Sequence, residues 1–241
     1  MAAAVAAFWI FIWQIIYISV GQSILVPSPL AVLERLFEFC LEKSFWISVG
    51  TSLFRVVFGL FLGTVLGAIL AVLTSGSEFI KMLFAPVLHI IKATPVASFI
   101  ILAILWLSVE NVPVFTAMLI VLPTVWANTE KGILSVDNDL LRMGKAFGLS
   151  TKESFLRITV PSVRPYFIAA LNSAVGMAWK AGIAAEVICP YRDSIGSALH
   201  ESKITFETVD TFAWTAAVVV LSILLEKLVV RLTSKGGRKN A

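Results

Sequence analysis

The sequence predicts an all-α, polytopic membrane protein. About six transmembrane helices are expected in a single transmembrane domain, residues 1–241. Of its 241 residues, 59% are hydrophobic and only 14% are charged, whereas soluble domains are about half apolar and one quarter charged. Apolar segments long enough to cross a bilayer as helices recur along the chain, since about 20 residues suffice. The sequence lacks the alternating strand patterns of a membrane barrel. The spans are therefore expected to be helices, which satisfy the hydrogen bonds of the backbone N–H and C=O groups in lipid.

Short polar or proline-containing segments separate the predicted spans. The first span follows no basic segment and has no clear cleavage site, so it is expected to be retained rather than removed as a signal peptide. Pro86 and Pro95 are expected to interrupt the third span, and broken helices are tolerated where protein or a cavity satisfies the backbone. The predicted spans cover approximately residues 2–20, 45–74, 82–107, 112–127, 165–188 and 211–232.

Two further helical features precede the third span. Residues 30–43 have the pattern of an amphipathic helix at the membrane interface, with Ser28 as its cap and Pro29 at its first position. The second span carries overlapping Gly-x-x-x-Gly units, which allow another helix backbone to approach closely. We expect tight helix packing at these glycines, which are Gly59, Gly63 and Gly67.

Basic residues set the expected orientation. With the N-terminus in the cytoplasm, four Lys/Arg fall on the opposite side, namely Arg35, Lys43, Arg192 and Lys203. Cytoplasmic segments are enriched in Lys and Arg, so both termini and the loop 128–164 are expected in the cytoplasm. The twelve basic residues on that side are Lys81, Lys131, Arg142, Lys145, Lys152, Arg157, Arg164, Lys227, Arg231, Lys235, Arg238 and Lys239.

The loop 128–164 contains a polar, basic stretch, residues 142–161, that reads RMGKAFGLSTKESFLRITVP. Gly148 is suited to close one helix in the left-handed conformation. Ser150 and Glu153 have the spacing of a capping box that starts the next helix. That helix is expected to end before Pro161, because proline disfavours helical geometry in the residue before it.

From Gly148 the stretch continues through nine residues to Ile158, Thr159, Val160 and Pro161. This frame resembles the cytoplasmic EAA loop of permease subunits from binding-protein-dependent ABC importers. The Glu-Ala-Ala of the loop is replaced by Arg-Met-Gly at 142–144, so the resemblance is carried by the half after Gly148. It extends over nearly the whole chain and is closest to the nitrate/sulfonate/taurine branch, through LVPSP at 25–29, SLFRVVFG at 52–59, ATPVASFIILAILWLS at 93–108, TEKGILSVD at 129–137 and AAEVI at 184–188.

The resemblance implies a subunit of an ATP-driven importer in the bacterial plasma membrane. A second permease copy or paralogue would complete the solute pathway, a cytoplasmic ABC ATPase dimer would bind ATP and Mg, and an extracytoplasmic binding protein would deliver the solute. This sequence lacks a phosphate-binding Gly-rich loop, so no cofactor is expected in this chain. The loop would contact the ATPase through a coupling helix; its residues would be Gly148, Ser150, Lys152, Glu153, Phe155, Leu156, Arg157 and Pro161.

Charged residues within the predicted spans need a physical reason, because each costs about 2.5 to 3.5 kcal/mol at mid-helix. Arg55 is expected to form a structural ion pair with Glu186, with substrate contact as the alternative. Lys92 is expected near the cytoplasmic end of its span, where its stem can snorkel to water. Lys180 is expected to face the pathway or the subunit interface.

The role of Lys180 depends on the solute, which the sequence leaves open as a small organic or inorganic compound. For an anion, Lys180 and Arg55 would lower the electrostatic barrier, and Trp179 would supply a flat wall. For a neutral or cationic solute, Lys180 would instead pair with Glu186, although a separation of six residues does not place them on one helix face.

Two other functional classes stay open at this point. An ion-driven secondary transporter would titrate Glu186, and an intramembrane enzyme would use Glu186, Lys180, Arg55 and His89. Neither class needs the capped helix in the loop 128–164. No catalytic nucleophile set, metal site or nucleic-acid motif is expected, since His89 and His200 lack neighbours at ligand spacing. A disulfide between Cys40 and Cys189 stays open, although isolated cysteines are usually buried hydrophobes.

Overall fold

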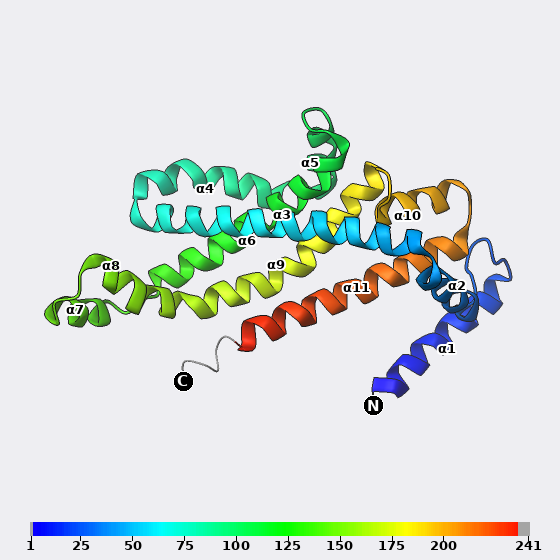
Figure 1. The fold of residues 1–241 in the computed structure, drawn as a ribbon, viewed down its shortest axis with the longest axis horizontal. Coiled ribbons are helices and arrows are strands. Elements are labelled where there is room, and N and C mark those ends of the chain that lie inside the picture. Colours follow the sequence, from blue (N-terminus) through cyan, green and yellow to red (C-terminus); the bar gives the residue numbers. More distant parts are fainter. Residues whose placement is uncertain (1, 236–241) are drawn as a thin grey trace.

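The computed structural model describes residues 2–235, and in that range the chain forms helices and no strands (Figure 1). The all-α prediction is therefore confirmed. The helices are α1 Ala2–Val20, α2 Pro29–Leu41, α3 Lys43–Gly76, α4 Glu78–Ala93, α5 Val96–Ile104, η1 Val109–Asn111, α6 Val112–Leu134, α7 Asn138–Ala146, α8 Thr151–Ser154, η2 Phe155–Thr159, α9 Val160–Ile188, α10 Ile195–Ile204 and α11 Thr208–Lys235.

Four helical segments of the described chain are long and apolar enough to cross a membrane, and a bent pair makes up to five. The pair is α4 and α5, which meet at an angle of 104°. The break lies at Thr94 and Pro95, whereas Pro86 lies inside α4 and does not end it. The interruption expected at Pro86 is therefore wrong. α1 is apolar over Ala4–Val20, but this stretch is shorter than the four long segments.

Helices α3, α6 and α9 form the centre of the bundle (Figure 1). The three glycines of α3 face the α6 backbone. A Cβ built at Gly59, Gly63 or Gly67 would lie 2.5, 2.6 or 2.7 Å from the nearest α6 carbonyl oxygen. Only a hydrogen in place of the side chain permits this approach. The glycines therefore set the distance between α3 and α6.

Helix α2 packs against the start of α11. Ser28 caps α2 by accepting a hydrogen bond from the Ala31 backbone N–H at 3.2 Å. Arg35 donates to both carboxylate oxygens of Asp210 at 2.8 and 2.9 Å, and this pairing together with Glu38 raises the pKa of Arg35 above its usual range. The expected amphipathic helix is thus present and is fixed to α11 by an ion pair.

The segment 189–210, which separates the last two predicted spans, contains the helix α10. Ser194 starts this helix by accepting a hydrogen bond from the Ser197 backbone N–H at 3.1 Å. Of the two cysteines, Cys40 is exposed on α2 and Cys189 is buried after α9, and both are free thiols. The disulfide left open by the sequence is not formed in this structure.

Replacing Gly63 with alanine is predicted to lower the stability of the bundle by about 1–3 kcal/mol, the usual range for overpacking. Its new Cβ would meet the Met118 carbonyl oxygen, and backbone cannot move aside as a side chain can. The matched control is Gly50→Ala on the same helix, where nothing lies within 4 Å of the added Cβ. Thermal unfolding midpoints of both variants in mild detergent test this. Equal midpoints would contradict the packing role of Gly63.

Candidate functional site

The loop between α6 and α9 projects from one end of the bundle as two short helices, α7 and α8 (Figure 1). α7 closes through Gly148, whose φ of +76° lies in the left-handed region. The Leu149 N–H donates to the Gly144 carbonyl at 2.9 Å across this turn. Glycine adopts such a conformation without the steric penalty of a Cβ. Gly148 therefore sets the angle at which the chain enters α8.

The capping box predicted at the start of α8 is present. The Ser150 hydroxyl oxygen accepts from the Glu153 N–H at 3.3 Å, and Glu153 Oε2 accepts from the Ser150 N–H at 3.0 Å. Arg157 Nη2 lies 3.8 Å from Glu153 Oε1 on the next turn. These contacts fix the residue at which the helix begins, Thr151.

The end predicted for this helix before Pro161 is wrong. α8 passes through one π turn, η2, and continues as α9, and Pro161 lies in the first turn of α9. The Val160 N–H donates to the Phe155 carbonyl across the π turn. Proline lacks an N–H, and the π turn directly before it accommodates that loss without ending the helix. The capped helix is therefore the start of one helical path, Thr151–Ile188, that includes the fifth predicted span.

The outer surface of the α7–α8 loop is apolar and basic. Phe147 is 82% exposed and Leu156 is 54% exposed, whereas Phe155, 40% exposed, lines a pocket with residues of α3, α6 and α9. Lys152 and Arg157 are exposed on the same short segment. The inner side is packed, since a Cβ built at Gly144 would lie 2.9 Å from Ile158 Cδ1. Sequence analysis missed Phe147; the signal was an aromatic residue directly before the glycine that ends α7.

At the opposite end of the bundle, Glu186 lies in a buried polar cluster and is 1% exposed. Its Oε2 accepts from Ser52 Oγ at 2.6 Å and from the Gly196 N–H at 3.2 Å, and its Oε1 lies 3.4 Å from Arg55 Nη1. Ser52 Oγ in turn accepts from the Ile195 N–H at 3.0 Å. The cluster joins α3, α9 and the first turn of α10.

The structure therefore brings Arg55 and Glu186 together, as the ion-pair interpretation requires. Arg55 also lies over the ring of Tyr191, 5.1 Å from its centroid. Because its charge is met within the protein, Arg55 is not placed to contact a solute in this structure. Lys180 does not join the cluster, so the pairing of Lys180 with Glu186 and the enzyme set built on both residues do not form.

Trp179 does not supply a wall for a pathway. It is 1% exposed, and its indole N–H donates to the Val218 carbonyl on α11 at 3.0 Å. The expectation failed because neighbouring residues on a helix point about 100° apart. A residue next to Lys180 therefore does not share its face of α9. Trp179 packs α9 onto α11.

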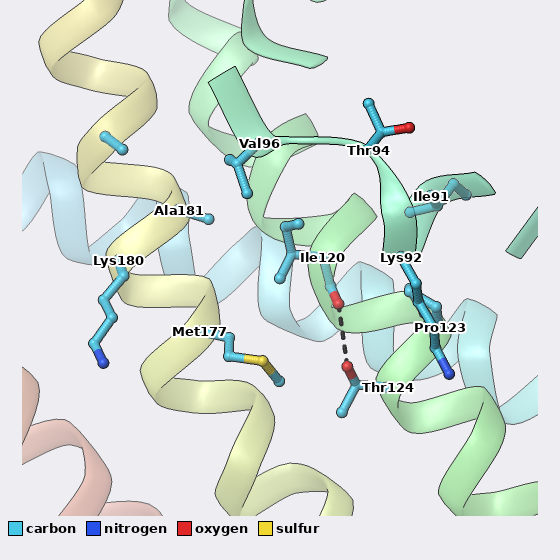
Figure 2. A pocket seen from close by; sticks show the side chains of 11 residues that line it. Ile91, Lys92, Thr94, Val96, Ile120, Pro123, Thr124, Met177, Lys180 and Ala181 are labelled. Carbon is cyan, nitrogen blue, oxygen red and sulfur yellow. Dashed lines mark hydrogen bonds between the residues drawn. The ribbon is translucent and has the colours of Figure 1, made fainter. Parts of the chain in front are cut away.

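Lys180 lines a cavity of about 430 Å³ between α4, α5, α6 and α9 (Figure 2). Lys92, from the last turn of α4, lines the same cavity, and its Nζ lies 5.7 Å from the centroid of the Trp126 ring. Lys92 was expected near the cytoplasmic end of its span. It lies in the last turn of α4, directly before the break between α4 and α5, whereas Lys81 lies near the start of α4.

No cluster of three metal-binding side chains occurs among the described residues. His89 is exposed on α4, and His200 Nδ1 lies 3.2 Å from the Val187 carbonyl. The two histidines therefore take no part in a shared site within residues 2–235.

A family model described as the inner membrane component of binding-protein-dependent transport systems matches residues 63–235. The chain belongs to this family. It is 26% identical over 196 residues to the nitrate import permease protein of Synechocystis sp., with 77% of this chain and 70% of that protein covered. It is 20% identical over 220 residues to the taurine transport system permease protein of Escherichia coli, with 89% and 80% covered.

The fold is also that of solved importers. A bacterial ABC transporter involved in the import of the acidic polysaccharide alginate matches with a TM-score of 0.67 and 13% identity, over 97% of this chain and 94% of that chain. Together with the relatives, this makes the protein an ABC importer permease of the nitrate/sulfonate/taurine type, a multi-pass protein of the inner membrane. It is a transport subunit and not an enzyme.

Replacing Glu186 with methionine is predicted to destabilise the protein by about 3–5 kcal/mol, because the buried Arg55 charge would lose its partner. The double variant Arg55→Met with Glu186→Met removes both charges and is expected to regain part of that loss. Thermal unfolding midpoints of the two single variants and the double variant form the test. A double variant whose loss equals the sum of the single losses would contradict the pairing.

Proposed function

We propose that this chain pairs with a second permease, a copy of itself or a paralogue, to form the solute pathway of an importer. A cytoplasmic ABC ATPase dimer drives the cycle and holds the ATP and Mg, and an extracytoplasmic binding protein delivers the solute. Family membership supports this assignment, as does the description of the alginate importer in complex with a substrate-bound periplasmic protein. The ion-driven and enzymatic alternatives lack a comparable observation.

The exposed apolar surface of the α7–α8 loop carries the proposal. Phe147 and Leu156 are exposed on this loop, together with Met143 and the partly exposed Phe155, and a soluble surface seldom presents such a group without a partner. Helices that bind a groove do so through apolar anchors of this kind. Lys152 and Arg157 flank the anchors, so the groove on the ATPase is expected to be apolar with an acidic rim.

The helical path from α8 into α9 gives the loop a mechanical role. A displacement of α8 by the ATPase would move a helix that carries Lys180 and Glu186 at its far end. The packing of Gly144 against Ile158 keeps α7 and α8 together as one body during such a movement. In this account the loop acts as a lever rather than as a flexible tether.

The orientation belongs to the same proposal. The α7–α8 loop faces the cytoplasm, and α2, α10 and the Glu186 cluster lie toward the extracytoplasmic side. The excess of Lys and Arg at the α7–α8 end and in the tail supports this arrangement. Both termini are then cytoplasmic.

Replacing Gly148 with valine is predicted to weaken capture of the ATPase by about tenfold, since 1.4 kcal/mol corresponds to a factor of ten. A β-branched residue disfavours the left-handed φ by about 1–2 kcal/mol, so the turn changes and α8 enters at another angle. The measurement is ATPase copurified with the permease, together with ATP hydrolysis and solute uptake by the reconstituted complex.

The matched control is Gly21→Val, because Gly21 also has a positive φ, +65°, and nothing within 4 Å of an added Cβ, but lies in the connection between α1 and α2. It is expected to leave capture unchanged. Normal ATPase capture and uptake in a folded Gly148→Val protein would count against the coupling role of the loop.

A further inference from the structure

A separate cavity, of about 290 Å³, lies at the end of the bundle that carries the α7–α8 loop. Helices α3 and α6 form one side of it, and η2 and the start of α9 form the other. Its walls present almost only apolar atoms, so a water-soluble ligand would find few hydrogen-bond partners inside. The cavity therefore suits a hydrocarbon group. Its apolar lining includes Ala68, Val72, Ile133, Phe155, Val160 and Phe167.

The cavity continues into a shallow hollow on the surface of α3. Ala68 and Val72 line both spaces, and Ile69 and Leu73, each about half exposed, complete the hollow. α3 is one of the segments that are long and apolar enough to cross a membrane, and exposed apolar side chains on such a helix mark contact with lipid or with another protein. The entrance to the cavity therefore lies on an apolar surface of a membrane span.

The cavity also lies close to one boundary of the membrane. Val72 precedes the end of α3 at Gly76 by four residues, which is about 6 Å along a helix. Ile133 directly precedes the end of α6 at Leu134, and Val160 is the first residue of α9. Because these helices end or begin at this level, the lipid headgroups of one leaflet are expected beside the cavity.

Arg164 is the charged residue among the described residues of the lining. It is partly exposed, and within residues 2–235 no ion pair shorter than 4.0 Å involves it. Lys81, near the start of α4, differs in having Glu130 at 3.6 Å. Since the walls are apolar, Arg164 lines them with its hydrocarbon stem, and the charged end of such a side chain extends toward the polar boundary. Arg164 is therefore available to an anionic group from outside the chain.

We propose that this cavity is a binding site for an anionic phospholipid, with part of an acyl chain inside it and the phosphate beside Arg164. Charge complementarity favours this occupant, because basic positions between membrane helices bind anionic headgroups. An apolar side chain of a partner subunit would fill the cavity but leave Arg164 without a counter-charge. The lipid lies against η2, the joint between α8 and α9, and the site is separate from the solute pathway.

Photolabelling of the full chain tests the site. The protein, purified with the subunits that accompany it, is placed in phosphatidylcholine nanodiscs that contain a trace of phosphatidylglycerol or phosphatidylcholine with a diazirine in the acyl chain. Mass spectrometry identifies the labelled residues. We expect phosphatidylglycerol to label Ile133, Phe155 and Phe167 about fivefold more than phosphatidylcholine does, since one basic residue near a membrane surface contributes about 1 kcal/mol.

Two charge variants examine the role of Arg164. Arg164→Gln is expected to reduce labelling by phosphatidylglycerol to the level of phosphatidylcholine, whereas Arg164→Lys keeps the charge and is expected to keep the preference. The matched control is Lys145→Gln, which removes a positive charge from α7 at the same end of the bundle but outside the cavity. It is expected to leave the preference unchanged.

A second pair of variants examines the cavity itself. Val72→Phe places a larger side chain in the lining and is expected to lower labelling of the cavity by both lipids. Its control is Val57→Phe, because Val57 is a similarly exposed valine of α3 outside the lining, and this variant is expected to label as the unchanged protein does. Thermal unfolding midpoints show that each variant is folded.

Three results would overturn the proposal. The first is equal labelling of the cavity by the two lipids, and the second is a preference for phosphatidylglycerol that survives Arg164→Gln. The third is a cavity that neither lipid labels, which would assign it to a side chain of a partner subunit. Because the readout needs neither ATP hydrolysis nor transport, it is independent of whether Gly148→Val disrupts coupling.

Discussion

The structure depends on one buried carboxylate. Glu186 is satisfied by Ser52, Arg55 and the Gly196 N–H, so a single residue of α9 fixes α3 and α10. The arrangement requires glycine at 196, where a Cβ would overlap the Glu186 side chain. It also holds Arg55, whose charge is therefore met within the protein.

Helix α9 connects this fixed point to the α7–α8 loop. Its two early prolines, Pro161 and Pro165, remove N–H groups near its start, and the π turn accommodates the change in hydrogen bonding without breaking the helical path. Trp179 holds its middle against α11 by donating to the Val218 carbonyl. A movement of the loop therefore acts on a helix that is held to α11 through Trp179 and to α3 through Glu186.

Features set by local geometry were predictable from the sequence. The capping box of Ser150 and Glu153 depends on a spacing of three residues, and the glycines of α3 depend on helical periodicity. Features set by tertiary context were not. The helix continues past Pro161 because a π turn precedes that proline. The position of Lys92 beside a break depended on a bend at Thr94, and the direction of Trp179 depended on which face of α9 meets α11. α10 was missed because its Ser194 cap lies in a polar segment that also reads as a loop.

The central claim is that α8 and α9 move as one rigid lever. Pulsed electron spin resonance on the assembled importer tests it most directly, with spin labels at Lys152 and Ile188 in one protein and at Lys152 and Phe54 of α3 in another. The account predicts that the distance between the labels at 152 and 188 stays the same with and without a non-hydrolysable ATP analogue, while the distance between those at 152 and 54 changes. A change within the first pair as large as that in the second would contradict it.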